Sequence, residues 1–196
     1  MNKNLVEKQG ERHNEALIVS TPHKLDPVST VESVVAKALK TSANKIGLGD
    51  VKALISRMKG GDPLAFNYYN YNIAKQLAEV LGSWDKDIRA VYAHDYEGAT
   101  PEEICFEDAS AFSLVHMIIW AERKTKALDA LIETIDRVMV QHHRHILSLN
   151  KLEHVLDAQV IDDEDVRKRT GYAALLKSIY QPPIHVWHSA ALASED

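Results

Sequence analysis

The sequence contains a single cysteine, Cys105, and no apolar run that approaches the length of a membrane span. One cysteine excludes an intramolecular disulfide, and a helix needs about 20 consecutive apolar residues to cross a bilayer. Residues 1–5 also lack the apolar core that a secretory signal requires. These absences predict a protein of the reducing cytoplasm with no membrane partner.

Signatures of several common enzyme classes are absent as well. The chain has no G-x-x-x-x-G-K-[ST], no G-x-G-x-x-G and no G-x-S-x-G. Their absence argues against P-loop hydrolysis, Rossmann-type dinucleotide chemistry and α/β-hydrolase chemistry, because each depends on the turn that its pattern encodes. The zinc patterns H-E-x-x-H and paired C-x-x-C are also missing, so no cofactor follows from motifs.

Charge is distributed unevenly along the chain. Residues 1–59 hold ten Lys and Arg against six Asp and Glu, whereas residues 60–196 hold thirteen against twenty-two. An acidic body repels phosphate backbones, which disfavours nucleic acid as a partner. The basic front is nevertheless compatible with a helix pair that reads DNA, in a small regulator with an acidic ligand-sensing domain.

Three helices are predicted in the first half of the chain. Ser29 and Glu32 form a capping-box pattern for the first, and Asp50 is a favourable N-cap for the second. Asp62 followed by Pro63 starts the third. Residues 1–27 are polar and aperiodic and are predicted to be a flexible arm. The predicted units are therefore this arm, a helical subdomain (28–82) and a core domain (83–196); the last two are able to form one continuous domain.

The third helix, residues 63–81, is apolar on two nearly opposite sides. Such a helix is buried either between layers of one chain or between subunits. Burial between subunits predicts a homo-oligomer, most simply a dimer. Its tyrosines could stack on a planar small-molecule ligand, although a buried or subunit-facing helix explains them more simply. The candidate ligand-binding residues are Tyr68, Tyr69, Tyr71 and, on the next predicted strand, Tyr92.

The second half of the chain predicts strands separated by helices. Alternating and continuous apolar runs predict strands over 88–94, 112–121 and 156–161, with a further strand at 184–188. A long amphipathic helix is predicted over 124–148, and a last helix over 162–179. A single helix over 109–149 is rejected because the apolar residues of 111–121 would then lie on every side of that helix. The predicted fold is α+β, with N-terminal helices followed by a small, mainly antiparallel sheet of three to four strands packed on the long helix.

The chain has ten histidines, and three of them follow an apolar pattern. His94 and His116 are predicted to share one face of two paired strands, and His142 is predicted on the buried stripe of the long helix. With His145 one turn along, these side chains could hold a divalent transition metal. The simpler explanation is a core histidine that bonds a backbone carbonyl.

The absence of catalytic signatures favours a non-catalytic binding or scaffolding protein that self-associates through helical surfaces. One alternative is a metal-dependent enzyme with the histidine-lined site just described. The other is the DNA-binding regulator.

Overall fold

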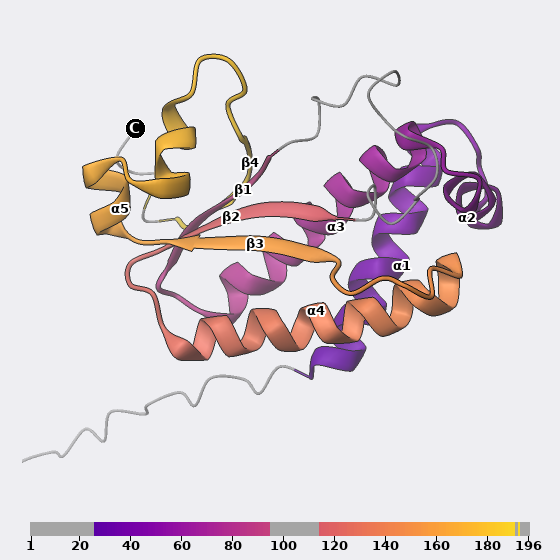
Figure 1. The fold of residues 1–196 in the computed structure, drawn as a ribbon, viewed down its shortest axis with the longest axis horizontal. Helices are drawn as coiled ribbons and strands as arrows, with labels where there is room; N and C mark the ends of the chain where they lie inside the picture. The colour runs from indigo at the N-terminus through magenta and orange to yellow at the C-terminus, as the bar shows by residue number, and fades with distance from the viewer. Residues whose placement is uncertain (1–25, 95–113, 191, 193–196) are drawn as a thin grey trace, which may run out of the picture.

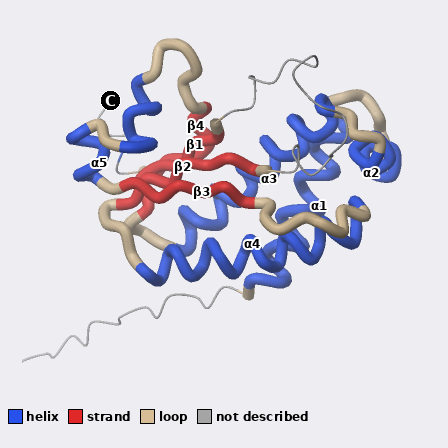
Figure 2. Tube along the Cα trace, viewed as in Figure 1, coloured by secondary structure: helices blue, strands red, loops and turns tan. Residues whose placement is uncertain are grey.

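A four-stranded sheet lies between two layers of helix in the computed structural model, which describes residues 26–94, 114–190 and 192. The helices α3 (Pro63–Trp84) and α4 (Lys126–Leu147) cover one face of the sheet, and α1 (Pro27–Lys45) packs against both helices. The short α5 (Asp163–Lys168) and the 3-10 helix η2 (Gly171–Lys177) cover part of the other face. Figures 1 and 2 show α4 below the strands and α5 above them.

Aspartates begin the N-terminal helices. Asp50 caps α2 (Val51–Lys59), and Asp62 caps α3 with Pro63 at its first position, as predicted. The expected start at Ser29 is wrong, because α1 begins one turn earlier with Asp26 as its cap and Pro27 following it. The Asp26 carboxylate accepts from the amides of Val28 and Ser29. The predicted arm, residues 1–27, otherwise lies outside the described residues.

Helix α3 is enclosed by its own chain on both apolar sides. One side packs against α1 and α2, and the other packs against β1, β2 and β4. The layered alternative of the sequence analysis therefore accounts for both faces, so α3 gives no support to self-association. One hydrophobic core also runs from α1 to β3, so the two predicted units of 28–82 and 83–196 share their buried residues.

The predicted third helix ends at residue 81, but α3 continues through Gly82 to Trp84. Gly82 is the point at which this helix contacts β4. A Cβ atom at this position would lie closer than 3.0 Å to three ring atoms of Trp187 on β4. The absent side chain thus lets the indole ring approach the helix backbone. This close approach joins the last turn of α3 to the edge of the sheet.

The sheet has the order β3-β2-β1-β4 and is mixed. The strand β1 (Ile88–Ala93) pairs antiparallel with β2 (Val115–Ala121) and with β4 (Ile184–His188). The strand β3 (Leu156–Ile161) pairs parallel with β2, because α4 carries the chain back across the sheet between them. The predicted α+β fold with a mainly antiparallel sheet is therefore confirmed. The strand predicted over 112–121 corresponds to β2, which spans Val115–Ala121. Residues 112 and 113 of that prediction lie outside the described part.

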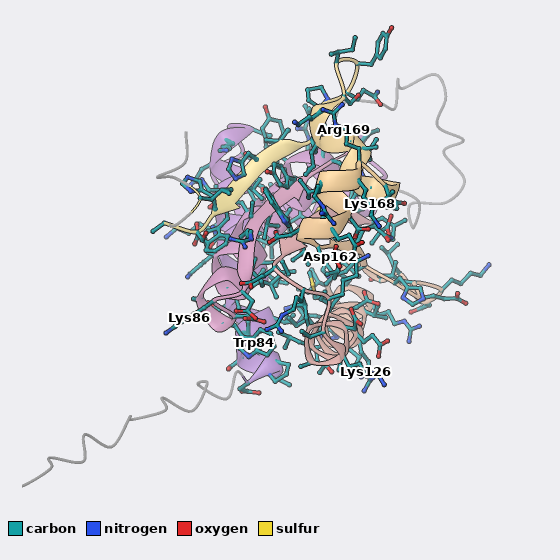
Figure 3. All side chains as sticks on the ribbon, turned by 90° about the vertical axis from the view of Figure 1, so that its left-hand side faces the viewer. Trp84, Lys86, Lys126, Asp162, Lys168 and Arg169 are labelled. Carbon is teal, nitrogen blue, oxygen red and sulfur yellow. The ribbon has the colours of Figure 1, made fainter. Side chains whose placement is uncertain are left out.

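The single helix predicted over 162–179 is wrong, because the structure divides it in two. Arg169 takes a left-handed backbone conformation with φ 55°, and Gly171 follows with φ 53°. These two residues end α5 and redirect the chain into η2. Asp163 fixes α5 to the sheet by accepting from Arg89 on β1 and from the indole of Trp120 on β2. Figure 3 views this end of the molecule, with Lys168 of α5 and Lys126 of α4 well separated.

No helix in the described ranges is both long and apolar enough to cross a membrane.

Candidate functional site

Three polar side chains lie side by side across neighbouring strands, on the sheet face opposite α4. The amide of His94 donates to the carbonyl of His116 (3.2 Å), which makes these residues cross-strand neighbours. His116 is in turn paired with Asp157 in the parallel register of β2 and β3. We call His94, His116 and Asp157 the histidine row. The predicted shared face of His94 and His116 is present in the structure.

Asp157 holds the ring of His116 in one orientation. Its Oδ2 atom accepts from His116 Nδ1 at 2.9 Å, and its Oδ1 atom accepts from Gln159 Nε2 at 2.8 Å. Partial burial raises the pKa of Asp157, but hydrogen bonds from Gln159 and His116 and the nearby imidazoles outweigh burial and leave it below its usual value. The ionised carboxylate favours the Nδ1–H tautomer of His116, so the neutral ring keeps Nε2 as an acceptor.

The row is partly open to solvent and is flanked by aromatic rings. The side chains of His116 and Asp157 are 23% and 34% exposed. The ring of His94 lies 5.3 Å from that of His116 and 5.8 Å from that of Tyr172 on η2, measured between centroids. The side chains of His116 and Asp157 are therefore accessible in part.

A second group of rings lies beside the histidine row on β1 and β4. Tyr92, one of the predicted ligand-binding residues, stacks on His185 with a centroid distance of 4.9 Å and an angle of 22°. His185 contacts His188 at 5.1 Å. Tyr92 has the same orientation as His94, because the two residues are separated by one position in an extended segment. The terminal strand therefore brings two further imidazoles to this face.

His142 and His145 do not join His94 and His116. Both belong to α4, which packs against the opposite face of the sheet. The histidine on the buried side of α4 is His143, which is 1% exposed, whereas His142 is only half-buried and His145 is exposed. The stripe was assigned one position too early: spacings of three and four make 142 and 143 equally acceptable after Met139, and only packing separates them.

His143 pairs with Tyr69 inside the core. Its Nδ1 donates to the carbonyl of Met139 at 2.8 Å, so Nε2 accepts from the Tyr69 hydroxyl at 3.0 Å. Burial lowers the pKa of His143 to about 4, against a partial opposing effect of the Met139 carbonyl. Burial also raises the pKa of Tyr69. This neutral pair links α3 to α4 and is a structural contact.

The predicted group of tyrosines is dispersed. Tyr69 is buried against His143, and Tyr71 receives Lys45, whose ammonium lies 5.6 Å from the ring centroid. The carbonyl of Tyr68 accepts from Ser42 and Asn72 in the α1–α3 contact. Tyr92 is thus the only member of the four that the structure places beside the histidine row.

Another hollow lies between α4 and β3, with a volume of about 620 Å³. Asp136 of α4 is one of the residues that line it: Oδ1 accepts from the amides of Val155 and Leu156, and Oδ2 accepts from His154 Nδ1, all at 2.8 Å. The hydrogen bond to Asp136 raises the pKa of His154. We call this hollow the α4–β3 groove. Asp136 ties the start of β3 to the helix below it.

Among the residues that the structure describes, no group of three or more His, Cys, Asp or Glu is arranged to hold a metal ion. The chain matches no protein-family model, no curated protein and no solved structure. Any functional conclusion therefore depends on the chemistry of the site itself.

Tyr92 was predicted from the sequence, whereas the central carboxylate, Asp157, and the rings of Tyr172, His185 and His188 were missed. Asp157 lies in an alternating strand pattern that predicts an ordinary side chain on the solvent-exposed face. The parallel pairing of β3 with β2 is what places it opposite His116. The only local signal was the expected fourth strand, 184–188, which contains His185 and His188.

Proposed function

We propose that this protein binds a small polar ligand at the histidine row, and that the ligand donates hydrogen bonds and carries no net negative charge. One observation supports the proposal most directly: on a partly exposed face, Asp157 Oδ2 lies 2.9 Å from His116 Nδ1 and orients this ring. The ring of His94 lies beside it. The resulting Nε2 acceptor suits a hydroxyl, an amine or an N–H group. Tyr172 offers a ring beside the same position.

Local charge supports the choice of ligand. Asp157 has a lowered pKa and is ionised near neutral pH. A negative environment attracts cationic or neutral donors and repels phosphates and carboxylates.

Histidine ring NMR tests the proposal at two levels. Without ligand, long-range ¹H–¹⁵N spectra should show His116 as the Nδ1–H tautomer, and Asp157→Asn should weaken this preference. Asp136→Asn is the matched control, because it removes the charge beside His154, while the asparagine oxygen can still accept from the Val155 and Leu156 amides at the start of β3.

The ligand arm of the experiment uses defined probes: ethanolamine, guanidinium and glycerol as donors, and phosphate as the anion. We expect the donors, at about 10 mM, to shift the His94 and His116 signals but not those of His142 and His145, as weak fragments do at that concentration. Asp157→Asn should reduce the shifts. The proposal is wrong if no donor shifts these signals, or if phosphate shifts them more than the donors do.

Acid–base catalysis at the same face is a second candidate function. It is favoured by the Asp157–His116 pair, because a carboxylate that orients an imidazole is a recurrent arrangement of a general base. The expected result is hydrolysis of an activated ester that is reduced by Asp157→Asn but not by Asp136→Asn. Equal rates in wild type and Asp157→Asn would exclude this candidate.

A further inference from the structure

The strand β3 forms one edge of the sheet and lacks the features that usually protect an edge. It pairs with β2 on one side, and no strand in the described ranges pairs with its other side. Its sequence, LDAQVI, has no proline, lysine or arginine, and its register with β2 is regular. The opposite edge, β4, follows Pro182 and Pro183 and has a register shift against β1. Since unprotected edges invite further pairing, β3 is the edge suited to a partner.

The hydrogen bonds of β3 identify which backbone groups face outward. The Val155 carbonyl accepts from the Val115 amide and so points toward β2. The Leu156 amide points the other way, toward Asp136. Because these directions alternate along a strand, Leu156, Ala158 and Val160 present their backbone groups at the free edge. The Leu156 amide already donates to Asp136 and is not available to a further strand. A ladder added at this edge therefore ends at Leu156.

The α4–β3 groove lies directly beside this edge. It is lined on the strand side by Leu156 and Ala158, and on the helix side by Ile132 and Val140 together with polar side chains. Leu156, Ala158 and Val160 pack toward the main core, so they share the helix-facing side of the strand. A strand added at the edge would bring its own apolar side chains over this groove.

We propose that a second copy of this chain pairs with β3, antiparallel and about a two-fold axis at Ala158, so that the two sheets become continuous. In this register Ala158 faces Ala158, and Leu156 faces Val160 of the second copy. Asp157 then faces Gln159, so a carboxylate meets an amide and no like charges oppose each other. Cross-strand pairs of this kind stabilise a sheet.

Other registers fit less well. Pairing Ala158 with Gln159 or Asp157 would face outward backbone groups against inward ones. An axis at Asp157 would set two carboxylates opposite each other, and an axis at Gln159 would set Asp157 opposite Ile161 and Leu156 opposite Asp162. An axis at Leu156 would place the amide that Asp136 already holds at the centre of the ladder, whereas the axis at Ala158 leaves that amide at its end. An axis at Val160 would run the second strand past Ile161, where β3 ends and α5 begins. The axis at Ala158 uses both Ala158 and Val160 as donors, sets Leu156 opposite Val160, and keeps Asp157 opposite Gln159.

Sedimentation velocity over a range of concentrations tests the proposal. Wild type should dimerise with a dissociation constant of about 1–100 μM, the range expected for a short ladder with a small apolar contact. Ala158→Pro removes an outward N–H, which an edge strand tolerates, and should weaken the dimer by tenfold or more with an unchanged far-UV circular dichroism spectrum. Tyr180→Lys is the control, since Tyr180 is 89% exposed in the loop before β4 and should leave the dimer intact.

A cross-link provides a second readout that does not depend on the proline variant folding. Paired residues in an antiparallel sheet have Cα atoms about 5.5 Å apart, within the range of a disulfide. In a Cys105→Ser background, Ala158→Cys should give a disulfide-linked dimer on mild oxidation, and Tyr180→Cys should give far less at the same concentration. A monomer at 100 μM, a dimer that Tyr180→Lys disrupts, or equal cross-linking at both positions would each overturn the proposal.

Discussion

Gly82 provides the sharpest test of how α3 and β4 are packed. In Gly82→Ala the new methyl group would lie closer than 3.0 Å to ring atoms Cζ2, Cε2 and Cη2 of Trp187. Two rigid groups meet here, a helix backbone and an indole ring, so neither can yield by a small side-chain rotation. The substitution must therefore displace Trp187 or tilt the end of α3.

Two opposing effects set the magnitude. Alanine is favoured over glycine in a helix by up to about 1 kcal/mol, and less near a helix end such as this one. Overpacking costs about 1–3 kcal/mol, and loss of most of the Trp187 packing would cost about 3–5 kcal/mol. The steric effect therefore wins, and we expect Gly82→Ala to lower the free energy of unfolding by about 1–3 kcal/mol.

Urea unfolding followed by tryptophan fluorescence measures this change, and a thermal scan should show a Tm lower by roughly 2–12 °C. Ser83→Ala, at the adjacent exposed position of the same helix, should change stability by less than about 0.5 kcal/mol. In a Trp187→Leu background the effect of Gly82→Ala should largely disappear, as expected for two directly coupled sites. A Gly82→Ala protein as stable as wild type would refute the packing of Trp187 on α3.

Two further predictions concern histidines outside the histidine row. The pKa of buried His143 falls from 6.5 to about 4, so the unfolded state binds more protons between these values and stability falls as pH falls, by roughly 3 kcal/mol in all. Urea unfolding from pH 7 to 4.5 should show this loss, and His143→Gln should remove most of it; an unchanged slope would contradict the assignment. His154 has a raised pKa because it donates to Asp136, so its contribution is present below pH 6.5 and is lost as pH rises through the folded-state value. NMR titration should show the His154 pKa return toward 6.5 in Asp136→Asn, and no change would exclude this hydrogen bond.

Helix starts were predictable where the chain carries a local chemical signal. Asp50, Asp62 and Pro63 act within one turn of their own position, so the sequence alone contains the relevant interaction. Ser29 was a reasonable cap on the same grounds, but Asp26 and Pro27 compete for the role and take it. Helix ends were harder, since the break at Arg169 depends on a left-handed backbone conformation that residue type does not require.

The candidate site was predictable only in part, for a geometric reason. His94 and His116 lie on strands whose period of two fixes which side chains share a face, so antiparallel pairing was enough to bring them together. Asp157 joins them only through the parallel pairing of β3, which requires α4 to cross the sheet. His142 and His143 differ by one position of a helix stripe, and the period of 3.6 residues does not decide between them.

The sequence by itself determined the class of fold and most element positions, because capping residues and apolar periodicity act locally. Only the tertiary structure decided what each apolar or polar face meets. It enclosed α3 within one chain, put α4 on the far side of the sheet from the histidine row, and made β3 an edge strand of the described sheet. The reason is that strand order, parallel pairing and choice of sheet face depend on contacts between residues far apart in the chain, to which no local pattern is sensitive.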